Sequence, residues 1–180
     1  MIIIDGTSEI EYAGKTKIAI GKFDGVHLGH RKLISEITKP AEGYKSLVFT
    51  FSYDSSLIYN KEKLLLSEEK RCEIFEKLGV DYLVEYKLDK ENASIDPTDF
   101  VKDILCKKLH AGLIAAGEDV SFGYMGKGNA DLLCKLSKEL DFEVEIIDKV
   151  KYKGEDISSS RIKEAIENGN NIDADRMLCD

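Results

Sequence analysis

Hydrophobic and polar positions change period repeatedly along the 180 residues, and the changes predict strands and helices in alternation. Near-continuous apolar runs, typical of strands, occur at residues 2–4, 17–20, 46–51, 80–86, 113–117 and 142–147. Helical spacing of apolar residues follows residues 30, 67, 96, 131 and 158, and a short helical tail is expected at about 171–180.

Helix start and stop signals agree with this pattern. Ser67 precedes two glutamates, and Asp96 precedes a proline, so both residues are expected to be N-caps. The helices that begin after Ser67 and Asp96 are expected to end at Gly79 and Gly112. Strands that alternate with helices of this length predict right-handed crossovers within one domain that spans residues 1–180. The fold class is therefore α/β, with a mainly parallel five-stranded sheet and helices on both faces.

Residues 17–30 hold the strongest chemical signal, because an apolar strand is followed by a glycine-rich turn and a helix start. Two of the three histidines, His27 and His30, lie on this turn. The first turn of a helix leaves amide groups without helical acceptors, and these groups bind anions. In parallel sheets ligands bind beyond the carboxyl ends of the strands. The 117–128 loop is expected to open on the same edge.

Composition limits the class of partner and the compartment. The formal net charge of −8 argues against a broad nucleic-acid surface, but it is compatible with nucleotide binding through amides and a few local cations. The four cysteines are widely spaced, as expected for reduced thiols rather than for a metal site. The N-terminus lacks signal-peptide features, and no segment is long enough to span a membrane. We therefore expect a cytoplasmic protein that binds no membrane.

Three stretches together resemble one family. Residues 21–30 read GKFDGVHLGH, residues 117–129 read GEDVSFGYMGKGN, and residues 157–163 read ISSSRIK. The first resembles the H-x-G-H motif of the nucleotidyltransferase superfamily. In this order the three resemble the adenylyltransferase (FAD synthetase) domain of bacterial bifunctional riboflavin kinase/FMN adenylyltransferases, and the resemblance covers nearly the whole chain. It implies a Rossmann-like nucleotidyltransferase fold.

The resemblance also implies a reaction, in which ATP and FMN give FAD and pyrophosphate with Mg²⁺ present. His27 and His30 would donate to oxygens of the α-phosphate. The implied ATP-binding residues are Gly21, Phe23, Asp24, Gly25, Gly29, Ser158, Ser159 and Ser160. The implied flavin-binding residues are Gly117, Asp119, Phe122, Gly123 and Asn129. No residue is expected to be a dedicated metal ligand.

Two positions depart from the family pattern. The arginine of the third motif falls at Lys163, while Arg161 occupies a variable position, so either residue could assist catalysis. Lysine lacks the planar fork with which arginine binds phosphate. Residues 51–55 replace a proline-histidine-proline turn that many members carry. A riboflavin kinase domain is not expected within these residues, and FMN would come from a separate kinase or from a missing C-terminal kinase domain.

Other interpretations remain open at this point. His27 and His30 could form half of a metal site with Asp24, the three serines could serve only to cap a helix, and the 117–128 loop could be an ordinary connection. The close functional alternative is another adenylyl- or cytidylyltransferase of the same fold. The alternative from a different class is a protein that binds flavin or ATP without turnover.

Overall fold

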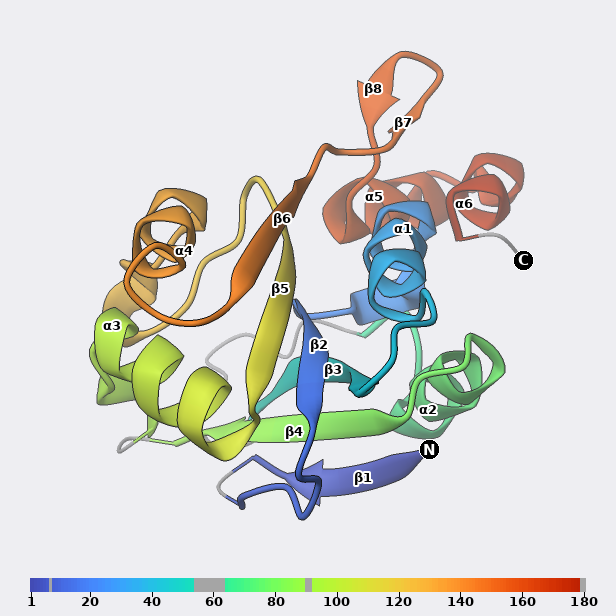
Figure 1. The fold of residues 1–180 in the computed structure, drawn as a ribbon. Coiled ribbons are helices and arrows are strands. Elements are labelled where there is room, and N and C mark those ends of the chain that lie inside the picture. The colour runs from blue at the N-terminus through green and yellow to red at the C-terminus, as the bar shows by residue number, and fades with distance from the viewer. Residues whose placement is uncertain (7, 54–63, 90–91, 179–180) are drawn as a thin grey trace.

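A computed structural model describes residues 1–6, 8–53, 64–89 and 92–178, and a parallel sheet lies at its centre (Figure 1). The sheet has six strands in the order β1-β4-β3-β2-β5-β6, and every neighbouring pair is parallel. The strands are β1 (Ile2–Asp5), β2 (Lys15–Ile20), β3 (Tyr44–Tyr53), β4 (Tyr82–Leu88), β5 (Ala111–Gly117) and β6 (Glu143–Ile147).

The strand order reverses next to β2. From β2 the chain builds outward through β3 and β4, and then it crosses back to add β5 on the other side of β2. Ile20 at the end of β2 is in register with Ala116 near the end of β5. The loops that follow these two strands therefore leave the sheet side by side, at the position where ligands bind in open parallel sheets.

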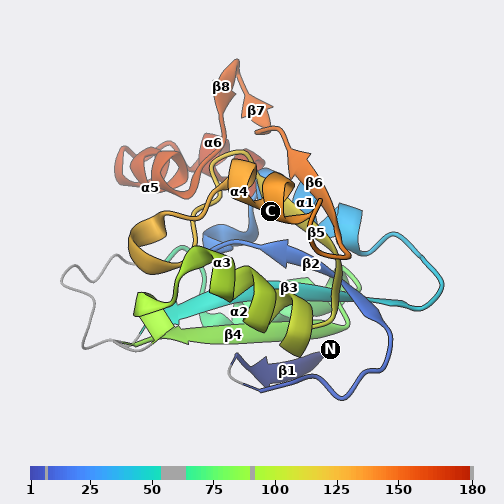
Figure 2. The same cartoon turned by 60° about the vertical axis from the view of Figure 1, so that its left-hand side comes forward.

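Helices cover both faces of the sheet (Figures 1 and 2). One face carries α1 (Leu28–Ile37) and α2 (Glu68–Lys77), and the other carries α4 (Ala130–Leu136) and α3 (Pro97–Asp99), which continues as a π-helix, η3 (Phe100–Lys108). Short 3₁₀ turns are η1 (Asp24–Val26), η2 (Asn92–Ser94) and η4 (Tyr124–Gly126). The chain then forms a projecting hairpin, β7 (Lys151–Tyr152) and β8 (Glu155–Asp156), before α5 (Ser159–Glu167) and α6 (Asn171–Leu178), whose apolar cluster packs against Leu28 at the start of α1.

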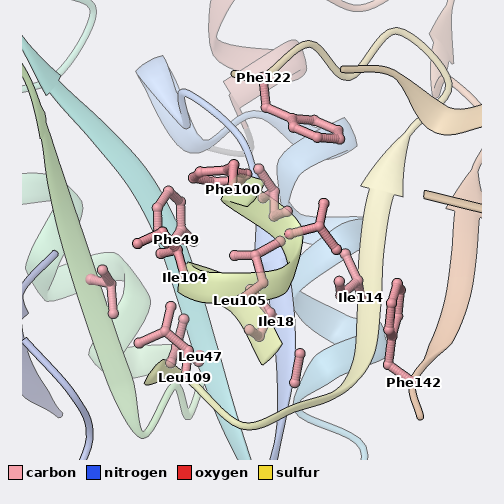
Figure 3. Packing of buried hydrophobic residues seen from close by; sticks show 14 of the residues in the cluster. Ile18, Leu47, Phe49, Phe100, Ile104, Leu105, Leu109, Ile114, Phe122 and Phe142 are labelled. Atoms are coloured by element: carbon pink, nitrogen blue, oxygen red, sulfur yellow. The ribbon is translucent and has the colours of Figure 1, made fainter. Parts of the chain in front are cut away.

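Alternate residues of the strands supply separate cores on the two faces. Ile18 and Ile20 of β2 point into the core beneath η3, whereas Ala19 packs under α1 and α2. In the first core an aromatic stack leads toward the carboxyl edge: Phe49 lies 5.4 Å from Phe100, which lies 5.5 Å from Phe122, measured between ring centroids (Figure 3). The core therefore reaches the loop that follows β5.

The structure confirms the α/β class and the parallel sheet, with three differences. The sheet has six strands rather than five, because the predicted strand at residues 2–4 pairs with β4 at its edge. Gly112 does not end a helix, since it lies inside β5, and His110 takes the left-handed conformation instead (φ 51°). The β7–β8 hairpin was not predicted, because strands of two residues leave no periodic signal.

The helix caps agree with their signals. Ser67, Asp96 and Ser158 each accept a hydrogen bond from a first-turn amide of α2, α3 and α5, and Gly79 follows α2 with φ 81°. The expected tail is α6, and residues 179–180 lie outside the described part of the chain. In that described part no helix has both the length and the apolar character needed to cross a bilayer.

We expect truncation of the aromatic stack to destabilise the whole domain. Phe49 is fully buried, so Phe49→Ala should lower the free energy of unfolding by about 3–5 kcal/mol, through lost burial and the cavity left behind. Urea denaturation measures the change. Ile172→Ala on α6 is the control, because Ile172 is 67% exposed and its loss should change stability by less than about 0.5 kcal/mol. A similar small effect at Phe49 would contradict the packing described.

Candidate active site

A cavity of about 550 Å³ opens at the carboxyl edge of the sheet. The loops after β2, β5 and β6 and the start of α5 surround it, so segments from the whole length of the chain meet there. Six of the expected nucleotide-side residues line it: Gly21, His27, Gly29, His30, Ser158 and Ser159. Four expected flavin-side residues line it as well: Gly117, Asp119, Phe122 and Gly123.

The turn between β2 and α1 has an unusual backbone. Phe23, Gly25 and Val26 all have positive φ, at 51°, 82° and 40°. Such values are uncommon for residues other than glycine and strained for a β-branched one, so the surrounding structure must hold this turn. A Cβ at Gly25 would approach the Leu65 Cδ1 methyl to 2.8 Å, so that side chain would have to move to accommodate another residue.

Side chains from several elements hold the carbonyl groups of this turn. Thr50 Oγ1 of β3 and Arg71 Nη1 of α2 donate to the Lys22 carbonyl at 3.1 and 3.4 Å. Arg31 Nε of α1 donates to the Val26 carbonyl at 3.1 Å, and Ser159 Oγ of α5 donates to the Asp24 carbonyl at 2.8 Å. Each bond comes from a different element, so the turn is fixed relative to the entire site.

His27 and His30 stack on each other at the start of α1. Their ring centroids are 3.7 Å apart and the ring planes are 15° apart. His27 is the N-cap of α1, and its Nδ1 accepts from the His30 amide at 3.4 Å. An accepting Nδ1 leaves Nε2 to carry the proton of the neutral ring. The buried Phe23 ring supports His30 from behind, at 5.0 Å between centroids, and therefore does not reach the cavity surface.

Both histidines are held neutral. Burial lowers the pKa of His27 to about 4, against the opposing effect of the Asp24 charge. Burial also lowers the pKa of His30 well below its usual value, and the neighbouring His27 adds to that shift. His30 Nδ1 is buried and has no hydrogen-bond partner within the described residues. At neutral pH the pair therefore offers directional N–H donors to an anion rather than positive charge.

Asp24 and Lys163 form an ion pair beneath the start of α5. Lys163 Nζ lies 2.9 Å from Asp24 Oδ2, and the Leu65 amide donates to Asp24 Oδ1 at 2.8 Å. Neither side chain lines the cavity. Of the two residues that could replace the family arginine, Lys163 is thus the one near the histidine turn.

Arg161 does not line the cavity and instead holds the β7–β8 hairpin. Its guanidinium donates to the carbonyl groups of Tyr152, Glu155 and Asp156 at 2.8–3.1 Å and lies over the Tyr152 ring. Ser158 uses its hydroxyl oxygen as the N-cap of α5, as the capping interpretation predicted. This cap uses the Arg161 amide, so it does not exclude anion binding by the other first-turn amides of α5.

The opposite wall is formed by residues after β5 and β6. Phe122 closes the aromatic stack at this wall (Figure 3). Asp119 forms an ion pair with Lys149 at 3.2 Å, between the loops that follow β5 and β6. Asn129 does not line the cavity; its side chain caps α4 by accepting from the Leu132 amide. Gly25 and Ser160 are also outside the lining.

Several lining residues were not predicted from the sequence. They are Ile20, Lys22, Leu33, Phe51, Leu88, Val120, Ser121, Gly126, Ile147, Asp148, Lys149, Val150 and Ile157. Lys22 lies inside the histidine motif and could have been found there. Ile147 ends β6 and residues 148–150 directly follow it, so the rule that sites lie at carboxyl ends of strands would have identified them. Of the doubtful 51–55 segment, Phe51 lines the cavity, and residues 54 and 55 lie outside the described residues.

The alternative of a metal half-site finds no support in the arrangement of donors. In the part of the chain that the structure describes, no three His, Cys, Asp or Glu side chains cluster closely enough to hold a metal ion. His27 Nδ1 already accepts from the His30 amide, and the Asp24 carboxylate is already paired with Lys163.

Comparison with known proteins identifies the family of this site. The FAD synthetase family model matches residues 9–161. A bifunctional riboflavin kinase/FMN adenylyltransferase of Listeria monocytogenes is 34% identical over 167 residues, which cover 89% of this chain and 52% of the relative. One from Buchnera aphidicola (subspecies Acyrthosiphon pisum) is 32% identical over 176 residues, covering 94% and 56%. The chain thus spans about half the length of these relatives.

Solved structures support the same fold. A Streptococcus pneumoniae protein named as a macrolide-efflux protein superposes with a TM-score of 0.83 at 26% identity, over 99% of this chain and 60% of that one. The pantoate-beta-alanine ligase of Francisella tularensis has a TM-score of 0.59 at 18% identity, over 96% and 77%. At that identity the second likeness concerns the fold alone.

Because His27 is buried and neutral, we expect the free energy of unfolding to decrease as the pH falls. Unfolded His27 has its usual pKa of 6.5, whereas the folded pKa is about 4, so the unfolded chain binds more protons between these values. Stability is thus full above pH 6.5 and declines toward pH 4, with about 2–3 kcal/mol lost through His27 by pH 4.5.

His27→Asn tests this prediction, because asparagine also caps helices but does not titrate. Urea denaturation at pH 7 and pH 4.5 should show a smaller difference for the variant by that amount. An NMR titration of wild-type His27 should give a midpoint near pH 4. A midpoint near 6.5 would contradict the burial that the structure gives this ring.

Proposed function

The chain belongs to the FAD synthetase family, and we propose that it transfers the adenylyl group of ATP to FMN, giving FAD and pyrophosphate. One observation carries the proposal. The paired histidines, the start of α5 and the loop after β5 line a single cavity of about 550 Å³. That volume is within the range of sites for small organic ligands, and its two walls differ in chemistry as two substrates require.

The phosphates of ATP are assigned to the wall made by the starts of α1 and α5. Neutral His27 and His30 donate N–H groups to α-phosphate oxygens, and the first-turn amides of α5 hold the β- and γ-phosphates. Anions bind to such donors without a matching positive side chain, which is consistent with the low pKa of both rings. The isoalloxazine ring of FMN is assigned to the opposite wall, near Gly117 and Phe122.

The chemistry needs no protein nucleophile. A phosphate oxygen of FMN attacks the α-phosphorus of ATP in line, the bond from that phosphorus to the bridging oxygen breaks, and pyrophosphate leaves with the electron pair. The protein holds two anions in this alignment and stabilises charge that develops on the transferring phosphoryl group. The His27 and His30 donors are positioned for this before the substrates arrive, since stacking and capping fix both rings.

Magnesium enters with ATP as part of the substrate. Mg²⁺ keeps most of its waters and binds phosphates with few protein ligands, so a dedicated cluster of carboxylates is not required. FMN would be supplied by a riboflavin kinase, the other activity in the names of the relatives.

The first test is direct. Purified protein with FMN, ATP and MgCl₂ should form FAD, measured by liquid chromatography, and release pyrophosphate in equal amount. Binding of both substrates with no FAD after several hours would refute the proposal and favour a protein that only binds flavin or ATP. Replacing FMN by other phosphorylated acceptors tests the alternative of a different nucleotidyltransferase; faster turnover with one of them would reassign the substrate.

The second test concerns His30. His30→Ala should lower kcat by about a hundredfold or more while changing the Kd of FMN by less than about threefold, because the ring acts on the transferring phosphate. Stopped assays give kcat, and quenching of flavin fluorescence gives the Kd. Equal losses in both quantities would place His30 in ground-state binding instead.

A further inference from the structure

Asp24 joins three segments that are far apart in the sequence. Its Oδ1 accepts from the Leu65 amide, its Oδ2 pairs with Lys163, and its backbone carbonyl accepts from the Ser159 hydroxyl, all at 2.8–2.9 Å. Two of these contacts go to α5, at its first residue and one turn further on. The helix is therefore attached to this one residue at two points.

The position of Asp24 links the two halves of the phosphate wall. Asp24 lies in η1, three residues before His27, on the strained turn whose other carbonyls are also held by side chains. Ser159 lines the cavity with His27, whereas Asp24 does not. A shift of Asp24 would therefore change the separation of the donors on the two halves of the phosphate wall without removing any donor.

A carboxylate this close to a phosphate site requires a reason. Its charge would repel ATP, unless a cation neutralises it. Lys163 supplies that cation: the two side chains are 25% and 11% exposed, so the pair is poorly screened by solvent. The pair adds no net charge to the site, and its contribution is the geometry that it fixes.

We propose that Asp24 is a positioning residue for the triphosphate, and that Lys163 acts mainly through Asp24 rather than by contacting phosphate. This assignment rests on the proposed function for its ligand, but the attachment of α5 to Asp24 does not. The competing possibility is that Lys163 leaves Asp24 and binds ATP directly. The two possibilities differ in how the loss of the Asp24 charge changes the affinity for MgATP.

The test uses Asp24→Asn, Lys163→Met and the double variant. Asparagine can still accept from Leu65, and methionine keeps the length of the lysine side chain, so each change removes mainly the ion pair. The Kd of MgATP is measured by calorimetry without FMN, and hydrogen exchange of the first turn of α5 is measured without ligand. We expect each single variant to weaken MgATP binding by about tenfold. The double variant should also weaken it by about tenfold, because all three variants break the same ion pair.

Hydrogen exchange at residues 159–163 should accelerate in all three variants. Kinetic assays should show a larger rise in the KM for ATP than fall in kcat. Ser159→Ala removes the hydroxyl contact to the Asp24 carbonyl, and because Ser159 also lines the cavity its readout is hydrogen exchange without ligand. Exchange should accelerate less than in the other variants, so Ser159→Ala still tests the attachment if the Asp24 and Lys163 variants do not fold. Glu164→Gln, an exposed charge change on the same helix, is the matched control and should alter neither measurement.

Two outcomes would overturn the inference. Tighter or unchanged MgATP binding by Asp24→Asn, with weaker binding by Lys163→Met, would show that the lysine binds phosphate directly. Losses that multiply to about a hundredfold in the double variant would show independent roles. Failure of the wild type to form FAD would refute the proposed function alone, because the exchange measurement tests the attachment of α5 separately.

Discussion

The parallel pairing of β2 with β5 is the constraint on which the site depends. Because the strand order reverses there, the loop that carries the histidines and the loop that carries Phe122 leave the sheet in the same direction. Neither loop alone could enclose a ligand with two chemically different ends. The hydrogen bonds between two central strands thus determine which distant parts of the chain can cooperate.

The elements that the sequence predicted are those with local causes. Capping residues, apolar periods and the H-x-G-H spacing act within a few residues, and Ser67, Asp96, Ser158 and the paired histidines lie where those signals placed them. The membership in the FAD synthetase family followed from three such local motifs. The family resemblance named ten of the residues that line the cavity, and their individual roles stay predictions.

What the sequence did not predict depends on long-range contacts. The attachment of Lys163 to Asp24 and of Arg161 to the hairpin carbonyls cannot be inferred from spacing, because the partners meet only in the folded chain. The edge position of β1 depends on the pairing of β4, which binds β3 on one side and β1 on the other. His110 has a positive φ, which is uncommon for any residue other than glycine. Gly112 misled the prediction because glycine also fits inside a strand that neighbouring side chains approach closely.

The strained turn between β2 and α1 has a consequence for how the site meets its ligand. Its left-handed residues cannot relax while side chains of β3, α1, α2 and α5 hold its carbonyl groups. The loss of conformational entropy at this turn therefore accompanies folding, not binding. The cost of holding this turn is thus part of the stability of the folded domain, and under the proposed function a phosphate would meet donors that need no rearrangement.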